Sequence, residues 1–419
     1  MHRLSRLLIV GLVLTLAACG SPVTPTAPAA PGVTSIPTTA PEPAATWPSE
    51  IFVVRPDGQA GPLVTYDMAD GSQRFSLPAG LLSADGQHYF AAETDGHKTS
   101  FHAFDPKTGE EQTSLDLNGA WALSGVSGNG RWAALTRLFD ESEKQSWAAT
   151  NEWKTEIRLL DTQTGELRDR IGLDGNFEVD AVSTYGDSLF LIEYLPAVNP
   201  DHYQVRLFNL TTQTLQEGAL VDKRAPDEVM AGERQDVVAS RDGDWVYSLY
   251  RRAQHNSAFI HALSTMDKFT LCIDLPWTSD STPEQLEAYT LALAPSGRVI
   301  YAANPALGLV ARVSLDDLSV STVAHFEPGL AASESLNRSL ISSDGQQFYF
   351  TNGQSLWGYN TNSRQISGPY QADAPVTGLG LSSDGQRLYV AHSDDSVSVL
   401  NAANGQAINF PGQPNTASQ

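Results

Sequence analysis

Cysteine is scarce in this 419-residue chain, which contains only Cys19 and Cys272. Two cysteines exclude a disulfide framework as the source of stability. A chain of this length can bury about three quarters of its unfolded surface and does not need one. Cys272 lies in the apolar run 269–275, where a buried, inert thiol is a more common state than a catalytic one.

Basic residues are also few. The chain has 26 Lys and Arg against 48 Asp and Glu, which gives a formal net charge of −22. This acidic excess argues against a nucleic-acid partner and against a domain that lies flat on anionic lipid. General solubility is the simpler explanation of the charge, and affinity for cations or basic partners is the alternative.

Sequence motifs for catalysis are absent. We find no Gly-x-Ser-x-Gly, His-Glu-x-x-His, phosphate-binding glycine loop or EF-hand loop, and no two histidines have the spacing of metal ligands on a helix. A site assembled from one residue in each of several repeats would leave no such motif, so an enzyme is disfavoured but not excluded. We therefore expect no cofactor, with a bound divalent metal as the alternative.

A glycine turn repeats along the chain every 40 to 57 residues. Serine stands three residues before six of the seven glycines, and an aromatic residue stands four residues after six of them. The glycines are Gly86, Gly130, Gly186, Gly243, Gly297, Gly345 and Gly385. Glycine adopts positive φ without a Cβ clash, and the recurring rings indicate packing between repeats.

Each repeat contains four short apolar runs separated by turns. In the last complete repeat, residues 375–410, the runs are 378–381, 387–391, 397–400 and 407–410. Four up-and-down strands with a period of this length predict an all-β fold, a β-propeller of four-stranded blades.

The number of blades is seven or eight. Seven glycine turns give seven blades, and the segment before the first turn contains three more strands, at 51–54, 63–66 and 74–77. The strand count favours eight blades, the first of which lacks its inner strand. The alternative is seven blades, with the N-terminal strands closing the ring in another way. We expect one domain over residues 50–410, with a single helical turn at 284–289, and a polar tail at 411–419.

The last repeat also resembles a known family. Tyr389-Val390-Ala391-His392, followed by 396–401 and Asn404-Gly405, is similar to the YVTN-type repeat of bacterial surface propellers. The resemblance implies a propeller but no particular activity, because such propellers serve binding, structural and enzymatic roles.

The N-terminus reads as an export signal. Arg3 and Arg6 precede a ten-residue apolar run, 7–16, that is too short to span a bilayer. Residues 16–20, Leu-Ala-Ala-Cys-Gly, resemble a bacterial lipobox. This implies a signal peptide at 1–18, a lipidated Cys19 and membrane attachment; an ordinary cleaved secretory signal is the alternative. Residues 21–49 include eight prolines and predict an extended linker. We expect an extracytoplasmic, membrane-anchored lipoprotein of a bacterial cell envelope.

The long insertions predict which face carries the function. In an up-and-down blade, the turns between second and third strands and the connections between blades share one face, which we call the insertion face. The long insertions all fall there, at 139–155, 195–203, 222–236, 276–289 and 325–338. Long loops on a rigid scaffold are common places for binding sites.

Exposed aromatic residues anchor many protein and sugar contacts. The candidate ligand-binding residues in these loops are Trp147, Trp153, His202, Tyr203 and Trp277. The alternative is that the aromatics pack against their own loops. The expected function is a binding or interaction module for a protein, peptide or glycan. One alternative is a metal-assisted lactonase or hydrolase with its site in the central channel, and another is a structural part of an envelope assembly.

Overall fold

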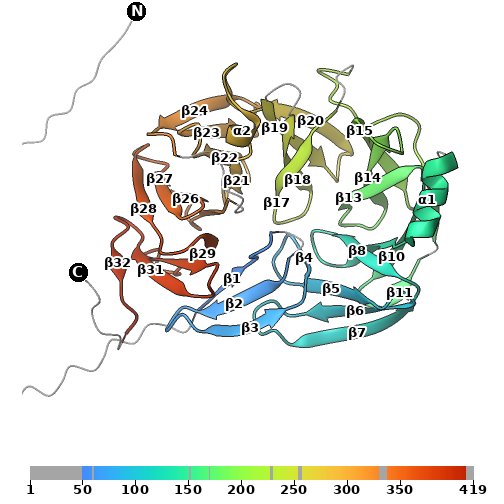
Figure 1. The fold of residues 1–419 in the computed structure, drawn as a ribbon, viewed down its shortest axis with the longest axis horizontal. Helices are drawn as coiled ribbons and strands as arrows, with labels where there is room; N and C mark the ends of the chain where they lie inside the picture. Colours follow the sequence, from blue (N-terminus) through green and yellow to red (C-terminus); the bar gives the residue numbers. More distant parts are fainter. Residues whose placement is uncertain are drawn as a thin grey trace, which may run out of the picture. The chain divides into compact units, whose positions relative to one another are not determined.

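The computed structural model describes residues 50–58, 61–150, 152–168, 170–226, 230–252, 257–329 and 337–411. They form eight antiparallel sheets arranged as the blades of a ring, with the first strand of a four-stranded blade nearest the centre (Figure 1). The prediction of a β-propeller with eight blades is confirmed.

The first half of the ring contains blades 1 to 4. Blade 1 consists of β1 (Ile51–Val54), β2 (Leu63–Asp67) and β3 (Gln73–Leu77). Blade 2 consists of β4 (Gly80–Leu82), β5 (Tyr89–Thr94), β6 (Lys98–Phe104) and β7 (Glu111–Asn118). Blade 3 consists of β8 (Trp121–Val126), β9 (Trp132–Arg137), β10 (Lys154–Asp161), β11 (Glu166–Leu167) and β12 (Ile171–Asp174), the last of which also pairs with β10. Blade 4 consists of β13 (Asn176–Val182), β14 (Ser188–Leu195), β15 (His202–Asn209) and β16 (Thr214–Leu215).

The second half contains blades 5 to 8. Blade 5 consists of β17 (Glu233–Ala239), β18 (Trp245–Arg252), β19 (Ser257–Ser264) and β20 (Phe269–Asp274). Blade 6 consists of β21 (Thr290–Leu293), β22 (Val299–Asn304), β23 (Leu309–Ser314) and β24 (Val320–His325). Blade 7 consists of β25 (Ser339–Ile341), β26 (Gln347–Asn352), β27 (Ser355–Asn360) and β28 (Ile366–Gln371). Blade 8 consists of β29 (Val376–Leu381), β30 (Arg387–His392), β31 (Val397–Asn401) and β32 (Ala407–Ile408).

Blade 1 lacks the inner strand, as the sequence predicts. Its second turn contains a hydrogen bond from the Gly71 amide to the Asp67 carbonyl (2.9 Å), which matches the bond from Gly405 to Asn401 (2.8 Å) in blade 8. That turn joins the third and fourth strands of a complete blade, so β1, β2 and β3 occupy the second, third and fourth positions.

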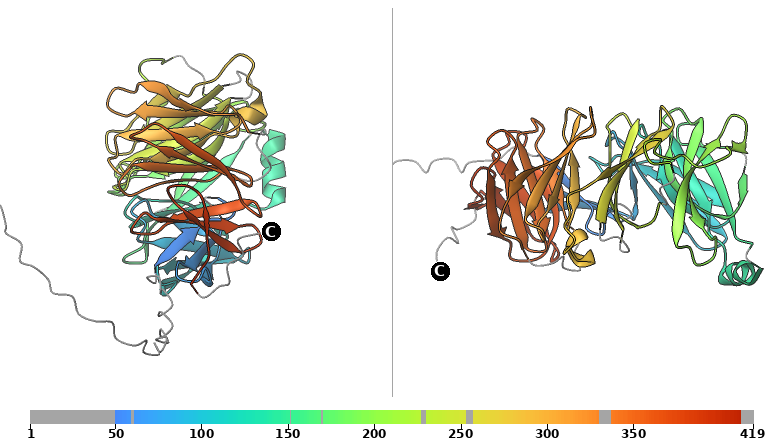
Figure 2. Two further views of the ribbon diagram at one scale, coloured as in Figure 1. Left: turned by 90° about the vertical axis from the view of Figure 1, so that its left-hand side faces the viewer. Right: turned by 90° about the horizontal axis from the view of Figure 1, so that it is seen from above.

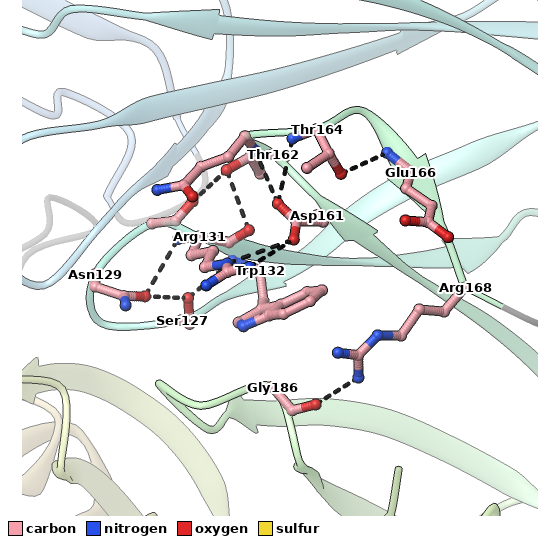
Figure 3. Close-up of polar contacts among 12 residues, drawn as sticks. Ser127, Asn129, Arg131, Trp132, Asp161, Thr162, Thr164, Glu166, Arg168 and Gly186 are labelled. Carbon is pink, nitrogen blue, oxygen red and sulfur yellow. Dashed lines mark hydrogen bonds and ion pairs between the residues drawn. The ribbon is translucent and has the colours of Figure 1, made fainter. Parts of the chain in front are cut away.

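The recurring serine holds the glycine turn together, as Figure 3 shows for blade 3. Ser127 is fully buried; its hydroxyl accepts the Trp132 amide hydrogen (3.0 Å) and donates to Asn129 (2.8 Å). Arg131 extends from the same turn to Asp161 (3.1 Å), and the indole of Trp132 lies between the guanidinium groups of Arg131 and Arg168 (5.1 and 4.0 Å to the ring centroid). The serine therefore satisfies buried polar groups that the tight turn would otherwise leave unpaired.

The recurring aromatic residues pack between blades. Phe90, Phe190 and Tyr389 are each at most 1% exposed. The Tyr349 hydroxyl in blade 7 donates a hydrogen bond to the Ala402 carbonyl in blade 8 (2.8 Å). The core is thus a continuous layer of side chains between neighbouring sheets.

Two helices lie on the insertion face. Helix α1 (Glu141–Thr150) follows β9, and α2 (Pro283–Leu286) precedes β21; both project from the same side of the disc (Figure 2). The short α2 was predicted and α1 was not. Helix α1 buries none of its residues and therefore lacks an apolar stripe in the sequence. In the described part of the chain, no helix has the length and apolar character needed to span a bilayer.

Candidate functional site

A cavity of about 380 Å³ lies between blades 4 and 5. Its walls come from the ends of β14 and β18, the start of β15, and the inner strands β13 and β17. These strand ends belong to the insertion face. The lining residues are Glu178, Ile192, Tyr194, Tyr203, Gly232, Glu233, Arg234 and Tyr250.

Arg234 organises the charged part of the cavity. Its guanidinium donates to Glu178 (3.0 Å) and to Asp180 (3.3 Å) across the blade boundary, and the Tyr194 hydroxyl donates to the other oxygen of Glu178 (2.7 Å). Hydrogen bonds to a charged partner are stronger than neutral ones. This network therefore fixes the carboxylate of Glu178 at the wall.

Asp180 is held beneath this network by a β-bulge. The pairing of β13 with β14 shifts register between Val179 and Ala181, which leaves Asp180 as the extra residue. Its side chain is 1% exposed, and one of its carboxylate oxygens has no hydrogen-bond partner among the described residues. Burial raises the pKa of Asp180 to about 6, although Arg234 acts in the opposite direction. Bulges frequently redirect side chains beside functional sites.

Stacked aromatic rings form another part of the wall. The ring of Tyr250 lies 5.4 Å from that of Tyr203 on one side and 5.4 Å from that of Phe259 on the other. The hydroxyls of Tyr203 and Tyr250 are buried and interact weakly with each other, and neither makes a hydrogen bond of normal geometry within the described residues. Burial raises the pKa of both hydroxyls, which therefore stay protonated.

A buried histidine extends this set of under-satisfied groups. His261 is 1% exposed, its ring lies 6.2 Å from that of Tyr250, and neither of its ring nitrogens has a partner in the described part of the chain. Burial lowers the pKa of His261 to about 4, so the ring is neutral at pH 7. An unsatisfied buried polar group costs about 1–3 kcal/mol, so three such side chains close together require a structural or functional explanation.

The rim of the cavity is fixed by Gly232 and an ion-pair chain. Gly232 has φ of 135°, and a Cβ there would lie 2.5 Å from the Arg251 carbonyl oxygen. Glycine is therefore required for β17 to start so close to β18. Arg251 binds Glu233 (2.5 Å) and Glu287 (3.2 Å), so one guanidinium is shared by two carboxylates at the rim.

The predicted ligand-binding residues lie at separate places on the insertion face. Tyr203 lines the cavity, whereas the neighbouring His202 is half-exposed and binds Asp201 (2.5 Å). Trp147 of α1 contacts Trp153 (5.8 Å between centroids) and Phe139 (4.5 Å), so these half-buried rings pack against one another. Trp277, which is 45% exposed, lies between β20 and α2. The role of these five residues in binding stays a prediction.

The sequence interpretation missed most of the cavity. The charged residues of the cavity come from the inner strands β13 and β17. In the sequence they are marked only as polar side chains near the starts of strands that should face the core. These residues meet only because the two blades are neighbours, and the inner strand of each blade has a register shift. The missed lining residues are Glu178, Ile192, Tyr194, Gly232, Glu233, Arg234 and Tyr250.

The structure describes one of the two cysteines and shows which carboxylate, thiol and imidazole groups lie together. Cys19 lies outside the described residues. Cys272 is only partly buried, in contrast to the expected buried thiol, because it lies on the outer strand β20, where its amide donates to Asp222 (2.9 Å). No group of three or more His, Cys, Asp or Glu suited to a metal ion occurs within residues 50–411 as far as they are described.

No family model matches the chain, and no curated protein matches its sequence. Several solved structures are similar in fold. They include the dihydro-heme d1 dehydrogenase NirN in complex with DHE (13% identity, 90% of this chain and 77% of that one, TM-score 0.49). They also include the Dos1 propeller (9% identity, 84% and 88%, TM-score 0.49) and the periplasmic gluconolactonase PpgL of Pseudomonas aeruginosa (14% identity, 78% and 98%, TM-score 0.40). Likeness at this level gives no information on function, and the fold assignment rests on the eight sheets of the chain itself.

Proposed function

We propose that this protein is a non-catalytic binding module of a bacterial cell envelope, tethered by a lipid on Cys19, and that its ligand occupies the cavity between blades 4 and 5. The observation that carries the proposal is the cavity itself, whose wall combines the ion pair of Glu178 and Arg234 with tyrosine side chains from two blades. The ligand is a protein, peptide or glycan segment that reaches the cavity from the insertion face.

The test of the site is a thermal-shift panel on residues 45–419, which form one compact unit. The panel contains divalent metals, cell-wall fragments, oligosaccharides, lactones and peptides. A ligand at 100 times its dissociation constant adds about 2.7 kcal/mol, which corresponds to a few degrees in the unfolding midpoint of a domain of this size. We expect Glu178→Gln to reduce this shift, because the amide keeps the shape of the side chain but removes the charge at the wall.

The matched control is Glu156→Gln. Glu156 also forms ion pairs, in its case with Arg137 and Arg170 (both 3.2 Å), but it lies in blade 3 away from the cavity. The control variant should keep the ligand-induced shift of the wild type. An equal shift in all three proteins would contradict the placement of the site, and the absence of any shift across the panel would contradict the proposal as a whole.

A hydrolase or lactonase with its site at the central channel is the second candidate. Asp180 and Asp236 favour it, because they lie on the inner strands of adjacent blades, β13 and β17. Burial raises the pKa of each to about 6, so each can hold a proton near neutral pH, as a general acid must. Recovery of the bound ligand chemically unchanged supports the binding module, whereas turnover that is lost in Asp180→Asn supports the hydrolase.

The lipid anchor is tested separately with Cys19→Ala in the full chain. Two or more acyl chains hold a protein stably at a membrane, and without the thiol no lipid can be attached. We expect the wild type in the membrane fraction and the variant outside it, with Ser21→Ala as the control that stays attached. A variant that remains in the membrane fraction would show that another feature causes the attachment.

A further inference from the structure

The charges around the cavity between blades 4 and 5 do not balance. Each of two guanidinium groups is shared by two carboxylates, so the acidic groups outnumber the basic ones. The carboxylates belong to Glu178, Asp180, Glu233 and Glu287, and the guanidinium groups to Arg234 and Arg251. When all of these groups are ionised, the cavity and its rim therefore carry an excess of negative charge that the described residues do not compensate.

Asp180 adds a buried and incompletely satisfied carboxyl group to this excess. Its side chain is 1% exposed, and one of its carboxylate oxygens has no hydrogen-bond partner among the described residues. The ionisable groups that interact with it all belong to the cavity wall: Glu178 on β13, Tyr194 on β14, Tyr203 on β15, Arg234 on β17 and Tyr250 on β18. A carboxylate in such a position is stabilised by an additional cation nearby.

Glu178 and Glu233 can be reached from the cavity. Both line it, and their side chains are 42% and 72% exposed. A carboxylate offers about four acceptor sites, and that of Glu178 receives hydrogen bonds from Arg234 and Tyr194, which leaves acceptor capacity for a ligand. Ammonium and guanidinium groups only donate hydrogen bonds and suit these acceptors, whereas an anionic ligand would be repelled.

The size of the cavity and the charge of the chain favour a basic side chain. A volume of about 380 Å³ is at the lower end of the range for small-molecule sites and admits the end of one lysine or arginine. The formal net charge of −22 attracts basic partners over a longer range. Among the ligand classes of the proposed function, peptides and proteins carry such cations on every lysine and arginine, whereas most glycans carry none.

We propose that the cavity between blades 4 and 5 binds a lysine or arginine side chain of a basic peptide segment, whose cationic end pairs with Glu178 and Glu233. This inference rests on the proposed function and specifies its ligand. Arg234 and Arg251 hold the carboxylates in place and leave part of their charge for the ligand.

The test is calorimetric titration of residues 45–419 at low ionic strength with alanine-based peptides that have blocked ends and a central lysine, arginine, glutamine or glutamate. We expect the lysine and arginine peptides to bind and the other two not to bind. Glu178→Gln should weaken the binding of the basic peptides about tenfold, the effect of losing one hydrogen bond to a charged group. Glu233→Gln should weaken it less, because the Glu233 side chain is more exposed to solvent.

Glu156→Gln is again the matched control, because it removes the same charge from blade 3, away from the cavity. It should leave the affinity for basic peptides unchanged, which separates pairing in the cavity from general attraction to an acidic chain. The unfolding midpoint of each variant without ligand checks that its fold is intact.

Equal affinities of the wild type and both glutamine variants, Glu178→Gln and Glu156→Gln, or an equal loss in the two variants, would overturn the cavity as the site of the basic side chain. Failure of both basic peptides to bind would overturn the inference in the same way. A neutral or acidic ligand, or a divalent metal, whose thermal shift depends on Glu178 would overturn the basic peptide as the ligand and leave the proposed site intact.

Discussion

Asp180 is buried with a single guanidinium as its charged partner. Arg234 reaches one carboxylate oxygen, and the other has no partner within the described residues. Glu178, itself negative, faces the same guanidinium and adds to the cost of the Asp180 charge. The ionised form is therefore destabilised in the folded state, in contrast to a carboxylate with several donors such as Asp222, whose pKa is lowered to about 2.

The pH dependence of stability should reveal this difference. Because the pKa of Asp180 is about 6 in the folded state and near 3.9 when unfolded, stability falls as pH rises from about 4 to 6 and stays reduced above that range. We expect Asp180→Asn to be relatively more stable at pH 8 than at pH 4, by up to an amount on the order of 3 kcal/mol. Chemical unfolding of wild type and variant at both pH values measures the effect.

Asp222→Asn provides the control with the opposite sign. Its carboxylate accepts hydrogen bonds from Arg224 and from the Cys272 amide. The ionised carboxylate therefore stabilises the fold, fully above about pH 4, and this stabilisation is lost as the pH falls from about 4 to about 2. The variant should therefore lose stability at pH 8 and recover relative to the wild type only in acid. If the difference between Asp180→Asn and wild type is the same at pH 4 and pH 8, the Asp180 carboxyl is not destabilised as inferred.

At the level of elements, strands were predictable and the free-standing helix was not. The strand at residues 51–54 has the same bounds in the structure, because an apolar run between turn signals defines it. Helix α1 has no buried face, so no periodicity identifies it. Its signal was the capping box of Asp140 and Glu143, in which the Glu143 amide donates to Asp140 (2.8 Å) and the Asp140 amide donates to Glu143 (3.1 Å).

The cavity could be predicted only as far as its face. Tyr203 was singled out because it ends a long insertion, but the same argument gave no reason to choose Tyr250, which lies within a strand. Arg234 and Asp180 are 54 residues apart and meet only because their blades are neighbours and β13 bulges at Asp180. Register shifts of this kind depend on the whole sheet, and no local pattern in the sequence marks them.

At the level of the whole molecule, the ring closes without a strand from the N-terminal blade 1 joining the sheet of the C-terminal blade 8. Blade 1 has three strands, and β1 packs directly against β29 of blade 8. Phe52 and Val54 occupy the space left by Gly378 and Gly380, where a Cβ would lie 2.4–2.5 Å from their side chains. The joint therefore depends on side-chain packing and on polar contacts across the gap.

Two polar contacts span this joint: Glu50, just before β1, accepts a hydrogen bond from the Ser383 amide of blade 8 (2.9 Å), and Arg338 makes the other. From its position just before β25 in blade 7, its guanidinium donates to the Thr377 carbonyl in blade 8 (2.8 Å) and to the Pro56 carbonyl in blade 1. Thr377 is the extra residue of a bulge in β29, which exposes its carbonyl to the arginine. One side chain thus links three blades at the point where the inner strand is missing.

We expect Arg338→Met, which keeps the aliphatic part of the side chain, to loosen this joint. The unpaired carbonyls and the weakened packing should raise amide hydrogen exchange in β1 to β3 and in β29 to β32, while blades 3 to 5 keep their protection. Arg298→Met, which removes an exposed ion pair with Asp316 (2.8 Å), should leave exchange unchanged. A uniform rise in exchange over all eight blades would show that Arg338 supports the whole ring, and no rise at the joint would show that the packing of Phe52 and Val54 and the bond from Ser383 to Glu50 close it without Arg338.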